Sequence, residues 1–317
     1  MPFIRAKYIG GEYYFYLVES RREGKLVRQK IVKYLGKRGD AEKYAREKKL
    51  EMPEIKKVFE KSEKALDKQI ARKKAKLDSL RPFPEVLEDR LREELVILWT
   101  YNSTAIEGSI LSLKETATFL AKGSVVGNKP LTDYLLARGH RNAINIVFNW
   151  IEEGKRELTK ADLVELHRTT MKDVIDIYLG VYRPAWVYLR DSTYTPPPPS
   201  QIPKLMRDFL QELNLNRKKH APIKLAALTH LDFESIHPFV DGNGEVGRLI
   251  ANWVLMKKGY PPIVITKQER AHYFRTLDEA RMKFATYRVV RFFNKKVNDA
   301  LDFYLKRLKS LVVPKHL

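Results

Sequence analysis

Residues 237–248 bring together side chains and glycines that could bind a phosphate and move a proton. The sequence His-Pro-Phe-Val-Asp-Gly-Asn-Gly-Glu-Val-Gly-Arg is followed directly by an apolar run, 249–256, that is typical of a buried helix. Glycines before a helix let backbone amides converge on one point, and the helix N-terminus adds partial positive charge there. We therefore expect Gly242, Asn243 and Gly244 to form a phosphate-binding seat.

Three side chains around this seat have the chemistry that phosphate transfer needs. The imidazole of His237 could accept a proton at neutral pH, because an unperturbed histidine has a pKa of about 6.5. The carboxylate of Asp241 could hold a Mg2+ ion that phosphates also bind. The guanidinium of Arg248 could bind either a carboxylate or a phosphate in bidentate fashion, but not both at once.

The segment resembles the signature of the Fic family, His-x-Phe-x-(Asp/Glu)-Gly-Asn-Gly-Arg-x-x-Arg, with Glu245 in place of the first arginine. The resemblance implies a mainly α fold, a Fic-type helical bundle with a β-hairpin flap. It also implies Mg2+-dependent transfer of AMP from ATP to a Ser, Thr or Tyr hydroxyl of a protein. In that chemistry His237 is the general base, Asp241 the Mg2+ ligand and Arg248 a phosphate ligand. Gly244 is retained, as in the AMP-transferring members.

Glu245 reverses the charge that the family has at this position. For like charges about 6 Å apart at an effective dielectric of about 20, the repulsion is roughly 3 kcal/mol, or about a hundredfold in binding. Glu245 also lies three residues before Arg248 on the expected helix, so we expect that the two can pair. We predict a folded protein with weakened nucleotide chemistry.

A second motif, Ser-Thr-Ala-Ile-Glu-Gly at 103–108, resembles the inhibitory motif of many Fic proteins. Mapped onto this chain, Glu107 would pair with Arg248 and deny it to the γ-phosphate of ATP, with Ser103 as the first motif residue. The motif precedes the core, as in the class with an N-terminal inhibitory helix.

The sequence Gly-Val-Tyr-Arg at 180–183 resembles the segment that precedes the family's flap. Residues 186–195 would be that flap, a β-hairpin that aligns a target protein by main-chain pairing. Four prolines, 196–199, follow it. The resemblance covers residues 85–300.

Helical patterns account for most of the chain after a break at Arg-Pro-Phe-Pro, 81–84. We place a domain boundary there, with a basic β-hairpin region and helical linker at 1–83 and the Fic-type helical domain at 84–317. The linker is expected over about 40–80. The expected helices of the second domain are 85–102, 112–122, 130–153, 159–173, 202–218, 222–236, 244–258, 267–285 and 288–311. Strands are expected within 6–35, with turns at 10–11 and 21–25.

The chain has 317 residues and a net charge of +21, and residues 1–83 carry 24 Lys/Arg against 12 Asp/Glu. This excess and the nearby tyrosines favour nucleic acid as a partner of residues 1–83, while solvation of exposed helices explains the lysines equally well. The absence of cysteine excludes disulfides and thiolate chemistry. No apolar run approaches the roughly 18 residues of a membrane span, so no membrane is expected. The start lacks a signal-peptide core, and we expect a cytoplasmic protein.

Three functions remain open on these grounds. The first is a protein adenylyltransferase that Glu107 inhibits, with a target protein docked on residues 186–195. The second is removal of AMP from a modified protein, with Glu107 positioning a water. The third is a catalytically poor nucleotide-sensing or nucleic-acid-binding protein on a Fic scaffold. The sequence does not settle the oligomeric state, and a homodimer is one candidate.

Overall fold

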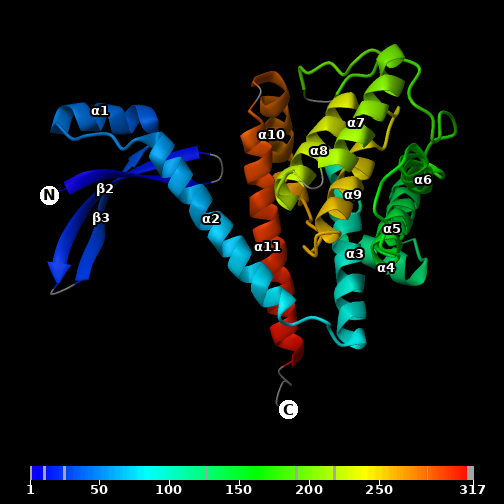
Figure 1. Ribbon diagram of the computed structural model, residues 1–317, viewed down its shortest axis with the longest axis horizontal. Coiled ribbons are helices and arrows are strands. Elements are labelled where there is room, and N and C mark those ends of the chain that lie inside the picture. The colour runs from blue at the N-terminus through cyan, green and yellow to red at the C-terminus, as the bar shows by residue number, and fades with distance from the viewer. Residues whose placement is uncertain are drawn as a thin grey trace. The chain divides into compact units, whose positions relative to one another are not determined.

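The computed structural model describes residues 2–9, 12–23, 26–125, 127–189, 192–216, 219–283 and 285–312. The chain divides into two compact units, Met1–Gln69 and Ile70–Leu317 (Figure 1). The division falls inside helix α2, Ile55–Asp78, and therefore earlier than the boundary predicted between residues 83 and 84. The end of α2 belongs to the second unit because Lys73 Nζ donates to Asn298 Oδ1 at 2.8 Å and to Asp302 Oδ2 at 2.5 Å.

The first unit contains a three-stranded antiparallel sheet in the order β1-β2-β3, in the region where strands separated by two turns were predicted. Its strands are β1, Pro2–Ile9, β2, Glu12–Glu23, and β3, Leu26–Gly36. Helix α1, Arg38–Lys48, packs against β2 and β3. The predicted turn at 10–11 and residues 24–25 of the predicted loop lie outside the described residues.

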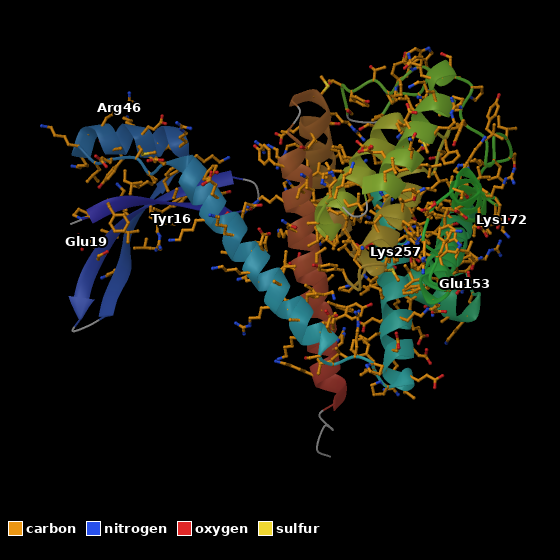
Figure 2. All side chains as sticks on the ribbon, in the orientation of Figure 1. Tyr16, Glu19, Arg46, Glu153, Lys172 and Lys257 are labelled. Carbon is orange, nitrogen blue, oxygen red and sulfur yellow. The ribbon has the colours of Figure 1, made fainter. Side chains whose placement is uncertain are left out.

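Alternation along β2 sets the two faces of this sheet. Phe15 and Leu17 point into the core beneath α1, and Tyr16 points to the opposite face, in register with Tyr34 of β3. Tyr16 is labelled in Figure 2, as is Arg46 near the end of α1. The buried residues of this small core are Ile4, Ala6, Phe15, Leu17, Leu35, Ala41 and Ala45.

The second unit is helical, as predicted. Its helices are α3, Glu85–Glu107, α4, Leu113–Lys122, α5, Leu131–Glu152, α6, Lys160–Met171, α7, Ile202–Asn216, α8, Pro222–Ile236, α9, Asn243–Met256, α10, Arg270–Lys283, and α11, Thr286–Val312. Two 3-10 turns, Pro199–Gln201 and Lys267–Glu269, precede α7 and α10. Helix α9 lies at the centre, since residues 243–255 are all buried and it contacts α3, α5, α6 and α8.

Helix α3 extends one and a half turns beyond its predicted end at residue 102 and stops at Gly108, whose φ of 123° few other residues adopt. Ser103 and Glu107 are therefore four residues apart on the last turn, on one face of the helix. Arg270 supports this turn, because its Nε donates to the Ile106 carbonyl at 2.7 Å. The longer helix is what delivers the second motif to α9.

The segment predicted as a β-hairpin flap, residues 186–195, contains no strand in its described part, 186–189 and 192–195. That prediction is wrong for these residues. Instead of a strand ladder, side-chain hydrogen bonds to α8 and α10 hold the segment. Among the described helices, none combines the length and apolar character that crossing a membrane requires.

Candidate active site

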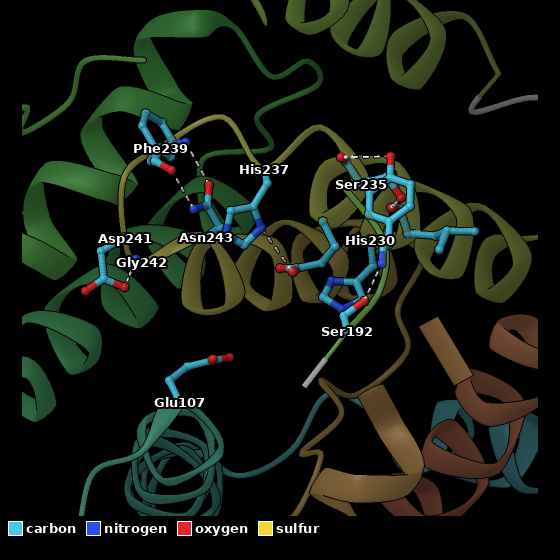
Figure 3. A network of polar contacts seen from close by, with 12 residues as sticks. Glu107, Ser192, His230, Ser235, His237, Phe239, Asp241, Gly242 and Asn243 are labelled. Carbon is cyan, nitrogen blue, oxygen red and sulfur yellow. Dashed lines mark hydrogen bonds and ion pairs between the residues drawn. The ribbon is translucent and has the colours of Figure 1, made fainter. Parts of the chain in front are cut away.

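The first motif forms the connection between α8 and α9 (Figure 3). His237 ends α8 in a left-handed conformation, φ 50° and ψ 62°, and its amide donates to the Phe233 carbonyl at 2.9 Å. Gly242 has a φ of 74° at the start of α9, and a Cβ there would lie 2.7 Å from Met171 Cγ. Glycine is therefore required at 242 for both its backbone conformation and its close approach to α6.

The Asn243 side chain braces this connection from inside. Its Oδ1 accepts from the Phe239 amide at 2.9 Å, and its Nδ2 donates to the Phe239 carbonyl at 2.9 Å. Both residues are buried. The amide of Asn243 thus fixes the shape of the loop, so any contribution of this residue to an anion seat comes from its backbone N–H.

His167 of α6 is a supporting residue that the sequence reasoning missed. Its ring stacks on Phe239 at 3.9 Å between centroids and 15° between planes. Its Nδ1 accepts from the Gly180 amide at 2.9 Å, so its Nε2 carries the proton and donates to the Asp241 carbonyl at 3.1 Å. Burial lowers the pKa of His167 to about 4, which keeps it neutral at pH 7. A histidine on the buried face of α6, next to Leu163, Thr170 and Met171, was the available signal.

The imidazole of His237 is in the protonation state that a general base needs. Burial, with the positive charges of Arg281 and Arg183, lowers its pKa to about 3, so the ring is neutral at pH 7. Its Nδ1 lies 3.9 Å from Glu234 Oε2. The side chain keeps 18% of its exposure, so a hydroxyl could still reach the ring.

Arg183 connects the motif loop, residues 237–242, to both ends of the flap segment, residues 186–195. Its backbone N–H donates to the Pro238 carbonyl at 2.9 Å and its Nε to the His237 carbonyl at 2.8 Å. Its Nη1 donates to the Ala185 carbonyl at 2.9 Å and its Nη2 to the Pro197 carbonyl at 2.6 Å. One buried guanidinium thus fixes residues on either side of 186–195 against His237.

Arg248 directs its guanidinium toward α3. Its Nε donates to Ser103 Oγ at 2.9 Å, its Nη2 to the Ser103 carbonyl at 2.9 Å, and its Nη1 to Glu107 Oε1 at 2.7 Å. All three nitrogens are engaged by the last turn of α3. The structure therefore brings the two sequence motifs, 141–145 residues apart in the chain, into direct contact.

Gly244 lies directly beneath the Glu107 carboxylate. A Cβ on Gly244 would be 2.1 Å from Glu107 Oε1 and 2.9 Å from Arg248 Nη1. The first turn of α9 therefore holds an anion supplied by the protein itself, at the place where the sequence predicts a phosphate. The N-terminus of a helix, with its free amides, suits a phosphate group as well as a carboxylate.

Glu245 is buried, with 3% of its surface exposed. Burial, and then the charge of Glu107, raise its pKa to about 8, against the opposing effect of Arg248. Glu245 is therefore mostly protonated at pH 7, and the predicted repulsion of phosphate is smaller than for a full charge. The predicted pairing with Arg248 is wrong: no ion pair joins the two side chains in the described chain, where Arg248 hydrogen-bonds to Ser103 and Glu107.

Asp241 presents an exposed carboxylate at the start of α9, and its Oδ1 accepts from the Gly242 amide at 2.8 Å. Within the described residues, no group of three or more His, Cys, Asp or Glu side chains could hold a metal ion. Mg2+ commonly takes one or two carboxylates and completes its shell with water and substrate phosphates. Asp241 suits a site of that kind.

The helical fold and the loop between α8 and α9 define the class of protein to which this chain belongs. Residues 157–255, which span α6 to the end of α9, match the model of the Fic/DOC family. The chain carries a Fic/DOC-family domain. It is 33% identical over 217 residues to the protein adenylyltransferase Fic of Drosophila grimshawi, and 34% identical over 217 residues to that of Drosophila virilis. Each match covers 68% of this chain and 44% of the relative, so the chain spans less than half the length of these curated relatives.

Solved structures share the fold. A Fic-domain-containing signaling protein from Bacteroides thetaiotaomicron superposes with a TM-score of 0.71 at 27% identity, covering 76% of this chain and 98% of that one. Fic-1 of C. elegans, residues 134–508, superposes with a TM-score of 0.71 at 24% identity, covering 80% of this chain and 76% of that one. The fold of the second unit is therefore the Fic fold.

Proposed function

We propose that the chain is a protein adenylyltransferase that transfers AMP from ATP to a Ser, Thr or Tyr hydroxyl of a target protein, and that Glu107 restrains this activity. The observation that carries the proposal is the Glu107 carboxylate held at Gly244 and Arg248, on the first turn of α9. This contact supports an anion seat on α9, in the same motif as His237, whose ring is neutral at pH 7. The family and the curated adenylyltransferases that the chain resembles support the same reaction.

In this reaction His237 takes the proton of the target hydroxyl. The hydroxyl oxygen forms a bond to the α-phosphorus of ATP, and the bond from that phosphorus to the β-phosphate oxygen breaks. Pyrophosphate leaves with the bonding electrons, and AMP stays on the target. The attacking oxygen and the leaving pyrophosphate must be in line, which depends on how the triphosphate is held.

Arg248 and the amides of α9 would hold the triphosphate, and Asp241 would hold Mg2+. Bound Mg2+ neutralises phosphate charge as the reaction proceeds. The guanidinium of Arg248 cannot serve Glu107 and a phosphate in the same geometry. With Glu107 in place, the phosphates that Arg248 should orient are excluded from it, so ATP would bind in an unproductive pose.

The test is incubation with ATP labelled on its α-phosphate, Mg2+ and candidate proteins from a cell extract. We expect a Glu107→Gly variant to transfer label at least tenfold faster than the unmodified chain, and His237→Ala in that background to abolish transfer. Glu93→Gly is the matched control, since Glu93 is an exposed glutamate on the same helix. Absence of label with both Glu107→Gly and the double variant Glu107→Gly/Glu245→Arg would refute the proposal.

Removal of AMP is the related alternative, in which Glu107 positions a water. Its support is that the Glu107 side chain is 30% exposed at the anion seat, so solvent reaches it. Incubation with a protein that already carries AMP separates the two directions. Release of AMP that depends on Glu107 would favour removal, whereas faster transfer in Glu107→Gly favours addition.

We further propose that a target segment docks along residues 186–195. Trp186 and Tyr188 are 54% and 86% exposed, so the segment offers large side chains to a partner. Arg183 fixes both ends of the segment against the motif loop. Cross-linking from position 188 to a labelled target would test this placement.

A second candidate function is contact with nucleic acid through the first unit. On the face of the sheet opposite α1, the Tyr16 and Tyr34 rings are 5.3 Å apart and Tyr14 lies 6.5 Å from Tyr34. Residues 1–69 carry 19 Lys/Arg against 11 Asp/Glu. Bases stack on such rings, and Lys and Arg neutralise the backbone.

Fluorescence anisotropy with a single-stranded oligonucleotide tests this second function. We expect salt-sensitive binding that Tyr34→Ala weakens about fivefold or more, since one stacked base contributes about 1–3 kcal/mol. Tyr188→Ala is the control, because this exposed tyrosine lies in the other unit. Equal losses in both variants, or binding insensitive to salt, would count against the sheet as the contact face.

A further inference from the structure

Two residues of the 186–195 segment are held by hydrogen bonds to α8 and α10. Ser192 Oγ donates to Asp278 Oδ1 at 2.7 Å and accepts from the Tyr194 amide at 3.1 Å. Tyr194 Oη donates to the Ser235 carbonyl at 3.2 Å. Figure 3 shows Ser192, Ser235 and His237 within one group of polar contacts. The flap segment is therefore bonded to the helix that ends at His237.

Arg281 of α10 lies buried beneath these contacts, with 3% of its side chain exposed. Its Nε donates to Ser235 Oγ at 3.2 Å, and its Nη1 lies 3.4 Å from Asp278 Oδ1. Its guanidinium is 5.1 Å from the centre of the Tyr194 ring. Arg281 thus touches a flap residue directly and shares Asp278 with another, Ser192.

Glu234 joins this arginine to the imidazole. Its Oε2 lies 3.9 Å from Arg281 Nη2 and 3.9 Å from His237 Nδ1, and its side chain is 6% exposed. Within the described residues, Glu234 Oε1, Arg281 Nη2 and His237 Nδ1 are buried and accept or donate no hydrogen bond. Burying three such groups without partners is costly, so their proximity needs a reason.

We propose that Glu234 is a positioning residue for His237, and that Arg281 couples it to the flap segment. This inference rests on the proposed function, in which His237 is the base. A carboxylate facing Nδ1 favours the tautomer with the proton on Nδ1, which leaves the lone pair on Nε2 for the target hydroxyl. After proton transfer, the same carboxylate stabilises the imidazolium. Arg281 favours the charged form of Glu234 against the effect of burial, and it contacts the Tyr194 ring of the flap segment.

His237 and Glu234 face charged and titratable groups from several elements, and Tyr273 of α10 is one that faces Glu234. Arg281 and Arg183 face His237, and Glu234 itself faces Arg281, Glu107 and Arg248. Burial raises the pKa of Glu234 to about 7, and Arg281 is the main group that opposes this rise. Removal of Arg281 should therefore raise the pKa of Glu234 further, so that the acid limb of the pH–rate profile moves to higher pH.

Kinetics in the Glu107→Gly background form the first test. We expect Glu234→Gln, which keeps the shape beside Gly247, to lower kcat at least tenfold while the KM for ATP changes less than twofold. Arg281→Met should move the acid limb of the profile to higher pH. The control is Glu269→Gln, because Glu269 pairs with Lys296 away from the motif loop. Loss of kcat equal to that of the control would overturn the proposal.

A second measurement does not depend on enzyme activity. Nitrogen-15 labelling of the seven histidines, with His237→Gln to assign the signal, reports the tautomer of His237 by NMR. We expect the proton on Nδ1 in the unmodified chain and a shift toward Nε2 in Glu234→Leu, in protein whose circular dichroism is unchanged. A proton on Nε2 in the unmodified chain, or an unchanged tautomer in Glu234→Leu, would overturn the proposal. An unchanged tautomer in Glu234→Leu would mean that the backbone carbonyl of Glu234, and not its side chain, orients the His237 ring.

Discussion

Glu107 Oε1 accepts a hydrogen bond of 2.7 Å from Arg248 Nη1, across the contact between the last turn of α3 and the first turns of α9. The same oxygen would be 2.1 Å from a Cβ on Gly244. The space in front of α9 is therefore filled by a carboxylate on a flexible side chain. Under the proposed function, this carboxylate would leave when a phosphate binds Arg248, which would make the restraint reversible.

Gly244→Ala should destabilise the protein through Glu107. The added methyl group would displace the carboxylate from Arg248, and overpacking of this kind costs about 1–3 kcal/mol. In a Glu107→Gly background the penalty should fall, because the obstructing oxygen is gone. Urea unfolding of the two single variants and the double variant measures this coupling. Additive losses would show that Glu107 does not occupy the seat in solution.

Glu245→Gln should become more stable than the unmodified chain as pH rises. Burial raises the pKa of Glu245 to about 8 in the folded state, above its ordinary value near 4.5. Its contribution to stability is therefore complete below about pH 4.5 and is lost as pH rises toward 8, by at most about 1.4 kcal/mol per pH unit. Glutamine stays neutral throughout, so it escapes this loss.

Urea unfolding at pH 5.5 and pH 7.5 measures the effect, with Glu93→Gln as an exposed control on α3. An equal difference between the variant and the unmodified chain at both pH values would show that Glu245 is ionised throughout. Affinity for ATP gives a second readout. It should weaken as pH rises through about 8 in the unmodified chain, because Glu245 gains its charge beside the phosphates.

Asn243→Ala should unfold the motif loop before the rest of the domain. The substitution leaves the amide and the carbonyl of Phe239 without their side-chain partners, and each unsatisfied buried group costs about 1–3 kcal/mol. Thermal unfolding and hydrogen exchange of the Phe239 amide measure the loss. Val240→Ala in the same loop is the control, since Val240 is 42% exposed. Similar hydrogen exchange of the Phe239 amide in both variants would show that the Asn243 side chain does not stabilise the loop.

The sequence predicted the parts of this site that depend on neighbouring residues, namely the ends of its helices. The apolar run after Gly244 predicted α9 to within two residues at each end. Ser112 and Thr159 were predicted as helix starts, and both close capping boxes with Glu115 and Asp162. These signals act over three or four residues, where spacing alone decides the geometry.

Spacing could not predict contacts between distant segments, and the pair of Glu107 with Arg248 was predicted only through the resemblance to the family's inhibitory motif. Spacing allowed Glu245 to pair with Arg248, but the guanidinium points to α3, where it hydrogen-bonds to Ser103 and Glu107. The resemblance to the family implied a hairpin at 186–195, whereas Arg183 and Arg281 contact the segment and residues beside it. Periodicity identifies a buried position and not the partner of a polar group placed there.

His140→Phe should make the protein more resistant to acid. His140 of α5 is fully buried against Trp99, with 6.3 Å between ring centroids, and neither ring nitrogen has a hydrogen-bond partner among the described residues. Burial, and then the charge of Arg248, lower its pKa to about 3, below its ordinary value of 6.5. The folded state therefore binds fewer protons than the unfolded state between these two values.

Stability due to the neutral His140 is complete above about pH 6.5 and is lost as pH falls toward 3, by at most about 1.4 kcal/mol per pH unit. Phenylalanine does not titrate, so the urea midpoint of His140→Phe should fall less between pH 7.5 and pH 5 than that of the unmodified chain. His220→Phe, before the start of α8, is the matched control. If both variants lose stability in parallel with the unmodified chain, His140 is protonated or solvated in the folded protein. The packing of a neutral His140 against Trp99 would then be wrong.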